Sequence, residues 1–499
     1  MLGNTKKINN FASNFKVSGN KLLIICNMTS RRNFLKTASL ASAGFALGST
    51  RINAKSYQQI IGANDRVNLA CVGIGNQGAA DIKTLARTNL ANIVALCDVD
   101  MGAKHTQEIT NLYPDAPRFK DFRTMFDKMG NKFDAVCAAI PDFAHFPVAM
   151  RSIKEGKHIF VEKPLSRTFL ESELLIQAAK KYPKIVTQMD NQGHSDANYF
   201  QFKAWKDAGI IKDVTAVTAH MNSSRRWHPW DSRIFKYPAP EPMPPGIDWD
   251  TWNMAVQYHE FNERYHPLTW RGWYDLGMGA LGDWGAHILD TIHEFLELGL
   301  PYEVSTTKLK EHNDYFFPMS STIVFKFAAR KNMPALDITW YDGVDNLPPL
   351  PEGYGGATVA DPNIPPPVGQ RQQPREFTPG KIIYSKELTF KGGSHGSTLS
   401  IIPEAKAKEM ESILPEVPKS PSNHYANFLL ACQGKEKTRS PFEVSGPLSQ
   451  VLCLGVIAQR IKTPLKFDTT TKQFTNNPFA NTMLTGLPPR SGWEDYYTI

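Results

Sequence analysis

The chain lacks several features that mark particular protein classes. No run of 18 or more apolar residues occurs among its 499 residues, which argues against a membrane-spanning helix. Charged residues make up 21% and hydrophobic residues 41% of the chain, the balance of a globular protein. This composition excludes a disordered tail protein, a collagen-like repeat and a coiled coil. At roughly 150 residues per domain, the length predicts two or three domains.

Acidic residues are absent from the first 54 positions, which hold eight Lys and Arg residues. The whole chain has 56 basic and 48 acidic residues, so the remainder, with 48 of each, carries no net charge. We therefore expect no electrostatic attraction between the body of the protein and nucleic acid.

The same basic segment has the pattern of an export signal. Residues 30–36 (Ser-Arg-Arg-Asn-Phe-Leu-Lys) match a twin-arginine motif, and an apolar stretch follows before the small residue Ala54. Met28 offers an alternative start just before the motif. We predict that residues 1–54 are an export region, that the twin-arginine translocase is a transient partner, and that the mature protein is periplasmic.

Cysteine is scarce, with six residues in the chain, five of them after residue 54, and no C-x-x-C. This pattern predicts buried free thiols rather than a disulfide framework. We also predict no metal site. A group drawn from residues 287–294 (His287, Asp290, His293 and Glu294) lacks the spacing of known zinc motifs.

Short apolar runs alternate with helical stretches between residues 67 and 188. Strands are predicted at 67–73, 93–97, 135–139, 158–161 and 185–188, and helices at 79–87, 102–112, 146–154 and 169–181. Such alternation predicts an α/β fold with a doubly wound parallel sheet of the Rossmann type. We assign residues 62–189 to this domain, 190–470 to a second domain and 471–499 to a polar C-terminal extension.

A glycine-rich turn joins the first predicted strand to the first helix. In this G-x-G-x-x-G pattern, the first glycine permits the tight turn, the second lets the backbone approach a pyrophosphate, and the third allows close packing of helix on strand. The predicted cofactor contacts in the turn are Gly73, Gly75, Asn76, Gln77 and Gly78.

Asp98 follows Gly78 by 20 residues, at the end of the second predicted strand. A carboxylate there accepts hydrogen bonds from the adenosine ribose hydroxyls. It would also repel a 2′-phosphate, so NAD is favoured over NADP. The alternative is a nucleotide-free sheet with a glycine-rich turn.

Polar residues also follow the later strands, at the carboxyl edge where ligands of such sheets bind. These predicted cofactor contacts are Pro141, Asp142, His145, Glu162, Lys163 and Asn191. Pro164 is compatible with a cis or otherwise rigid turn. Much later, Asp283 and His287 have i, i+4 spacing and would project from one face of a helix that begins near Gly282.

In their order along the chain, these blocks resemble the glucose–fructose oxidoreductase / inositol dehydrogenase (Gfo/Idh/MocA) family over nearly all of residues 66–470. The resemblance implies a C-terminal α/β domain with a large open, mainly antiparallel sheet, and a homo-oligomer. It further implies that Lys163 is the catalytic lysine, that Asp283 and His287 are its partners, and that Trp270 and Arg271 lie near the nicotinamide.

Eight of the ten tryptophans fall between residues 205 and 284. Indole faces stack on sugar rings, and indole N–H groups bond hydroxyls. The predicted substrate contacts are Trp227, Trp230, Trp273 and His194. A place in the core or at a subunit interface is the alternative for any single tryptophan. Residues 343–380, rich in proline, predict a long loop that is either a lid or oligomer arm or a surface insertion.

Together these patterns predict an exported, NAD-dependent oxidoreductase that acts on a secondary hydroxyl of a sugar, polyol or glycoside and holds NAD(H) tightly. The first alternative is an NAD-dependent glycoside-cleaving enzyme that works through a transient 3-keto intermediate. The hydrolase branch of the family has a stretch rich in glycine and histidine where this chain has residues 282–287. The second alternative is a non-catalytic carbohydrate-binding protein with a structural NAD.

Overall fold

The computed structural model describes residues 66–223, 236–331, 333–355 and 378–499. The predicted export region, Trp227 and Trp230, and most of the proline-rich loop lie outside the described residues. Apart from residues 470–472, the described residues belong to one compact unit, and the contacts below lie within it.

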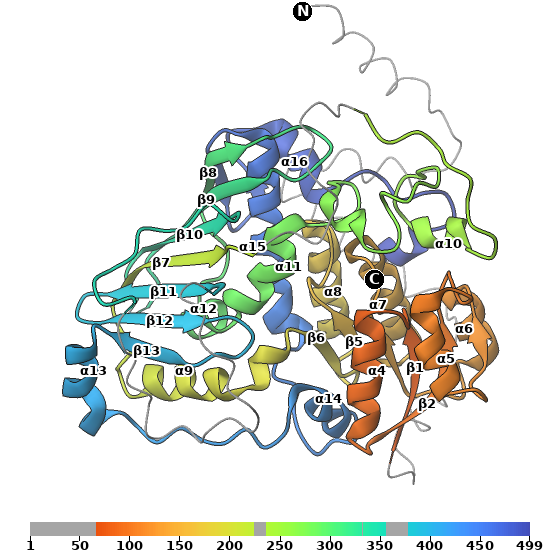
Figure 1. The fold of residues 1–499 in the computed structure, drawn as a ribbon, viewed down its shortest axis with the longest axis horizontal. Helices are drawn as coiled ribbons and strands as arrows, with labels where there is room; N and C mark the ends of the chain where they lie inside the picture. The colour runs from red at the N-terminus through yellow and green to blue at the C-terminus, as the bar shows by residue number, and fades with distance from the viewer. Residues whose placement is uncertain (1–65, 224–235, 332, 356–377) are drawn as a thin grey trace, which may run out of the picture. The chain divides into compact units, whose positions relative to one another are not determined.

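The N-terminal part is built on a six-stranded parallel sheet, sheet A, with the strand order β3-β2-β1-β4-β5-β6 (Figure 1). Its strands are β1 (Val67–Val72), β2 (Ala91–Cys97), β3 (Arg118–Phe119), β4 (Ala135–Ala138), β5 (His158–Glu162) and β6 (Thr187–Asp190). The chain order reverses between β1 and β4, so a ligand crevice is expected at the carboxyl ends of these strands. The predicted Rossmann sheet is confirmed.

The helices of this part are α4 (Gln77–Arg87), α5 (Gln107–Leu112), α6 (Phe122–Met129), α7 (His145–Lys154) and α8 (Phe169–Lys181). Helix α8 spans the predicted residues because Thr168 and Glu171 form a capping box at its start. The sequence analysis missed β3 and α6. Both are short, and α6 begins after an Asp121 side chain that accepts the backbone N–H of Arg123.

The C-terminal part contains a nine-stranded sheet, sheet B, with the order β13-β12-β11-β7-β10-β9-β8-β14-β15. Its strands are β7 (Val214–Met221), β8 (Glu303–Lys310), β9 (Ser320–Phe327), β10 (Leu336–Asp342), β11 (Gly380–Ser385), β12 (Thr389–Gly393), β13 (Leu399–Ile402), β14 (Leu465–Asp468) and β15 (Gln473–Phe474). The pair β7–β10 is parallel and the other pairs are antiparallel. The predicted large, mainly antiparallel sheet is confirmed.

Helices α9 (Ala197–Asp207), α11 (Gly279–Ile288), α12 (Asp290–Phe295), α14 (His424–Cys432) and α15 (Phe442–Ile461) complete the unit (Figure 1). Helix α15 packs against α8 of the first domain and against α11 and β8 of the second. In the part of the chain that is described, it alone is long and apolar enough to cross a membrane, yet 72% of its apolar window is buried in the fold. It therefore serves as a core helix that joins the two domains.

The C-terminal extension is an ordered part of the first domain's packing. It contains α16 (Pro478–Thr485) and a short 3₁₀ turn, Glu494–Tyr497. Trp493 and Tyr496 are buried and lie 6.1 and 6.2 Å, ring centre to ring centre, from Phe122. The Tyr497 ring lies 4.6 Å from that of Phe146. The sequence showed only a polar tail, because the partners of these aromatic residues lie more than 300 positions earlier.

The five cysteines after residue 54 are all buried and free, as predicted: Cys71, Cys97, Cys137, Cys432 and Cys453. Burial raises the pKa of each thiol. They are packing residues rather than nucleophiles.

Candidate active site

The glycine-rich loop runs from the end of β1 to the start of α4. Its three glycines are required because a side chain at any of them would collide with neighbouring atoms. Gly73 has φ +80°, and a Cβ there would lie 2.1 Å from the carbonyl oxygen of Ala139. A Cβ on Gly78 would lie 2.2 Å from the carbonyl oxygen of Gly73. A Cβ on Gly75 would meet the ring of His105 at 2.3 Å. Side chains are thus excluded at these three positions, which leaves the backbone there and the start of α4 to receive a diphosphate.

Asp98 holds this loop against the end of β2. Its carboxylate accepts the backbone N–H of Ile74 at 3.0 Å and that of Asp100 at 2.9 Å. Each carboxylate oxygen keeps a second lone pair, which is the acceptor capacity that a ribose diol needs. The loop and this carboxylate therefore fit NAD, and a direct contact of Asp98 with ribose stays a prediction.

Lys163 and Asp283 come together from the two domains. Lys163 follows the last residue of β5, and Asp283 lies on α11. The Lys163 Nζ donates to Asp283 Oδ1 at 2.7 Å and to the Asp283 carbonyl oxygen at 3.1 Å. The Asp283 side chain is 2% exposed and the Lys163 side chain 10%. The Lys163–Pro164 peptide is cis. The structure thus brings together two of the three residues predicted to be catalytic.

A second cation shares the Asp283 carboxylate. Arg271 Nε lies 3.4 Å from Asp283 Oδ1, and its guanidinium group lies over the ring of Trp270 at 4.3 Å. Asp142 lies nearby, and its carboxylate accepts the backbone N–H of Met278 at 3.0 Å. Burial raises the pKa of Asp142 to about 6, although the positive charge of Arg271 acts in the opposite direction. The predicted residues Asp142, Trp270 and Arg271 therefore surround the Lys163–Asp283 pair.

His287 lies one turn after Asp283 on α11 and is buried. Its ring stacks on that of His395, with centroids 3.9 Å apart and an interplanar angle of 25°. His395 is exposed, has φ +52° and lies between β12 and β13, where Trp284 meets it edge-on at 5.2 Å. The sequence analysis missed His395. Its one signal is a glycine-rich turn that contains a histidine, 108 positions after His287.

Three buried carboxyl groups lie beside Lys163, on Asp81, Glu162 and Asp190. Each offers one oxygen, and these three atoms lie within 4.8 Å of one another. Burial is the largest cause that raises the pKa of each, and mutual repulsion adds to it for Asp81 and Asp190. The hydroxyl of Tyr425 donates to Asp81 at 3.2 Å. The sequence predicts Glu162 as a cofactor contact and Asp190 as part of the run that lines the crevice, but gives no signal for Asp81, which lies on a helix.

His145 and Asn191 brace loops at the strand ends. The His145 ring nitrogens lie 2.7 Å from the carbonyl oxygen of Pro164 and 2.8 Å from that of Ile140. Burial lowers the pKa of His145 to about 4. Asn191 accepts the hydroxyl of Ser440 at 2.6 Å. Cofactor contacts by these two residues, and by Pro141, Asn76 and Gln77, stay predictions.

His194, predicted to contact substrate, is instead clamped between two carboxylates of α12. Its Nε2 lies 2.5 Å from Glu294 Oε2, and its Nδ1 lies 3.4 Å from Asp290 Oδ2. Burial alone would lower the pKa of His194, but hydrogen bonds with Asp290 and Glu294 raise it to about 9. With 1% of its side chain exposed, His194 is a structural cation.

Trp273, also predicted to contact substrate, belongs to the core. It is fully buried, and its ring centre lies 3.9 Å from that of Phe316. Its indole N–H donates to the carbonyl oxygen of Arg264 at 2.8 Å. The polar atom that would bond a sugar is therefore satisfied inside the protein. Among the described tryptophans, Trp284, beside His395, is better placed than Trp273 to contact a sugar.

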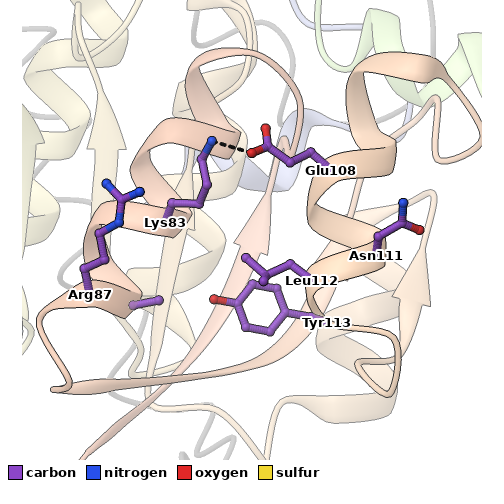
Figure 2. A pocket seen from close by; sticks show the side chains of 7 residues that line it. Lys83, Arg87, Glu108, Asn111, Leu112 and Tyr113 are labelled. Carbon is purple, nitrogen blue, oxygen red and sulfur yellow. Dashed lines mark hydrogen bonds and ion pairs between the residues drawn. The ribbon is translucent and has the colours of Figure 1, made fainter.

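A pocket of about 670 Å³ lies elsewhere, between α4 and α5. Figure 2 shows Lys83 and Arg87 on one side of it and Glu108 on the other, with the Lys83–Glu108 ion pair of 2.6 Å between them. None of the residues that line it is a predicted site residue, so Lys83 serves below as a control position.

Two family models match the chain. The Gfo/Idh/MocA model described as "Oxidoreductase family, NAD-binding Rossmann fold" matches residues 67–189. The companion model, "Oxidoreductase family, C-terminal alpha/beta domain", matches residues 203–329. Together they cover half of the chain, and the first identifies the N-terminal domain as NAD-binding.

Curated relatives match over a shorter stretch. The chain is 28% identical over 176 residues to a glycosyl hydrolase family 109 protein of Solibacter usitatus, covering 33% of this chain and 39% of that protein. It is 31% identical over 156 residues to inositol 2-dehydrogenase of Salmonella typhimurium, covering 31% of this chain and 45% of that protein. The matches thus span less than half the length of these relatives.

Among solved structures, the WlbA dehydrogenase of Bordetella pertussis, in complex with NADH and UDP-GlcNAcA, superposes with a TM-score of 0.52 at 13% sequence identity. The superposition covers 81% of this chain and 100% of that one. At this identity, the likeness shows that the two proteins share a fold.

Proposed function

Because the chain belongs to the Gfo/Idh/MocA oxidoreductase family, we propose that it oxidises a secondary hydroxyl group of a sugar, polyol or glycoside with NAD. The observation that carries this proposal is the 2.7 Å contact of Lys163 with Asp283, which joins the nucleotide edge of sheet A to the second domain. The relatives add support, because their names and ligands concern inositol, glycosides and a nucleotide sugar.

The residues that would hold NAD are the glycine loop and Asp98. When bound there, NAD would supply the acceptor for the hydride of the carbon atom that is oxidised. Lys163 is the group that we assign to take up the hydroxyl proton, and Asp283 at 2.7 Å stabilises its protonated form. Arg271 Nε lies 3.4 Å from the same oxygen of Asp283 and so helps to orient the carboxylate. His287 donates a hydrogen bond to the reacting oxygen.

The proposal includes the place of action and the state of the cofactor. Twin-arginine export delivers folded proteins, so we propose that NAD is loaded in the cytoplasm and held tightly in the periplasm. A second substrate with a carbonyl group then returns the cofactor to its oxidised state. Denaturing protein taken from its own export route and assaying for NAD(H) tests this, and nucleotide-free protein that exchanges added NAD freely would contradict it. We also propose a homo-oligomer, which sedimentation velocity tests.

The test of the reaction is reduction of the cofactor by a panel of sugars, polyols and glycosides, followed by absorbance at ~340 nm. Lys163→Met should abolish the signal while the bound NAD content stays unchanged. Lys83→Met, the same substitution in the pocket of Figure 2, is the matched control and should react like wild type. Equal reduction by wild type and Lys163→Met would overturn the assignment of Lys163.

A second function is favoured by one observation, the 28% identity to a glycosyl hydrolase family 109 protein. In this alternative, oxidation at C3 acidifies the proton on C2, and the aglycone leaves by elimination. Water then adds to the C1–C2 double bond, and the hydride taken from C3 is returned to the transient ketone. Nitrophenyl glycosides distinguish the two functions. Release of nitrophenol without net formation of NADH supports cleavage, and no release across the panel argues against it.

A further inference from the structure

A segment of the second domain, residues 246–267, reaches the end of strand β2. The backbone N–H of Asp248 donates to the carbonyl oxygen of Val99 at 2.9 Å. The Nζ of Lys120 donates to the carbonyl oxygen of Gly246 at 2.5 Å. His266 Nε2 lies 3.2 Å from Asp100 Oδ2. This segment is therefore seated on the loop that follows Asp98.

Three side chains with metal-ligating atoms converge at this contact: Asp100, His105 and His266. Each offers one ligand atom, and these atoms all lie within 4.8 Å of one another. The His105 and His266 rings meet edge to face, with centroids 5.9 Å apart. The side chains of His266 and Asp100 are 11% and 16% exposed, so the group is sheltered but open to a small ion.

The surroundings hold these side chains in place. The carbonyl oxygen of Asp100 accepts the backbone N–H of Ala103 and the hydroxyl of Thr106, which fixes the loop. The stacked rings of Trp249 and Trp252, 4.2 Å apart, both present edges to His266, at 6.3 and 6.2 Å. A supporting shell of this kind orients metal ligands before the ion arrives.

We propose that Asp100, His105 and His266 form a site for a divalent transition-metal ion of the zinc class that ties the second domain to the nucleotide-binding domain. Two imidazole nitrogens and one carboxylate oxygen are a donor set that suits zinc and leave one position for water.

Because the proposed ion lies beside the glycine-rich loop, it should affect the binding of the cofactor. The ring of His105 lies against Gly75, where a Cβ would touch it at 2.3 Å. The carboxylates of Asp98 and Asp100 lie at the same edge, which has to accept a diphosphate. A bound divalent cation offsets their charge and anchors residues 246–267 across this edge. Sequence spacing could not reveal the site, because the third ligand lies 161 positions after the second.

The test uses untagged holoprotein that has been treated with a chelator and dialysed. Co²⁺ is titrated by visible absorbance and Zn²⁺ by calorimetry. Wild type should bind one equivalent of either ion, and His266→Ala and Asp100→Asn should each weaken binding at least ~tenfold. His312→Ala removes a histidine elsewhere, near Tyr274, and should bind like wild type. No substrate is needed, so failure of the proposed reaction leaves this result interpretable.

The proposal would be overturned if wild type showed no saturable binding of the ions. It would also be overturned if wild type, His266→Ala and Asp100→Asn bound them equally. Circular dichroism establishes that each variant is folded. A second measurement uses wild type alone. Zn²⁺ should protect His105 and His266 from diethyl pyrocarbonate, read by peptide mass mapping, and leave His395 reactive. Equal modification of His105 and His266 with and without Zn²⁺ would also contradict the site.

Discussion

Two buried ion pairs involve carboxylates on consecutive helices, α11 and α12. Comparing them distinguishes a pair that takes part in the proposed reaction from a pair that stabilises the fold. Lys163 pairs with Asp283 on α11, and His194 pairs with Asp290 and Glu294 on α12. Both cations follow strands of sheet A, but only the Lys163–Asp283 pair joins the two domains, because His194 and its partners all lie in the second. In each case the helix supplies the carboxylate.

The two cations differ in what remains open to a ligand. His194 has both ring nitrogens beside carboxylates, and 1% of its side chain is exposed. Lys163 has one carboxylate partner, which it shares with Arg271, and 10% of its side chain is exposed. A buried basic side chain can exchange a proton with a substrate only where it keeps an open side. We therefore expect substitutions at Lys163 to remove activity, and substitutions at His194 to remove stability.

The largest effect is expected at Lys163. Lys163→Met should lower kcat by about 10²–10⁴-fold, because the general base is lost. Asp283 keeps Arg271 as a partner, so the thermal midpoint should change little. Steady-state kinetics and calorimetry on the same preparation measure both quantities. A variant that unfolds easily but keeps its kcat would reverse the comparison.

The next effect concerns stability. His194→Gln should lower the free energy of unfolding by about 3–5 kcal/mol, because the buried Asp290 loses its imidazolium partner. Glu294→Gln is the matched control and should cost less, because the Glu294 side chain is 25% exposed. Urea unfolding measures both. Loss of turnover in His194→Gln at unchanged stability would place His194 in the reaction instead.

The His194 clamp also predicts a pH dependence. Its pKa is about 9 in the folded protein, above the ordinary value of 6.5, so its contribution to stability is complete below that ordinary value. The contribution is lost as pH rises through about 9, and amounts to about 3 kcal/mol. Unfolding of wild type and His194→Gln across this range should therefore converge at high pH. A constant difference between them would contradict the clamp.

The smallest effect is expected in the carboxyl cluster beside Lys163. Asp190 is fully buried, and burial together with Asp81 and Glu162 raises its pKa, so its ionised form disfavours the folded state near neutral pH. Asp190→Asn should stabilise the protein by about 1 kcal/mol. Urea unfolding at neutral pH measures this change. Destabilisation would show that the charge on Asp190 has a stabilising partner, as the charge on His194 does.

The nucleotide-binding half could be predicted because its signals are local. The glycine loop, Asp98 and Lys163 each follow a strand directly, and parallel strands present such residues at one edge. Asp283 and His287 were found because one helical turn separates them. Sequence spacing gave no such signal for His395 or His266, which reach their partners only through tertiary packing.

In the second domain, by contrast, the sequence predicts substrate contacts that the structure does not support. The tryptophan-rich segment predicts sugar contact, yet Trp273 packs in the core with its N–H satisfied by a backbone carbonyl. Composition does not reveal whether an indole faces the core or a ligand. The prediction that His194 contacts substrate is wrong for a similar reason. Its carboxylate partners lie about 100 positions away on α12, so its sequence neighbours do not reveal them.

The most direct measurement is reduction of protein-bound NAD by sugars, polyols and glycosides, with wild type and Lys163→Met compared at equal nucleotide content. The account predicts a rise in absorbance at ~340 nm in wild type with at least one compound, and none in Lys163→Met. Equal reduction in both proteins would contradict the role of the Lys163–Asp283 pair.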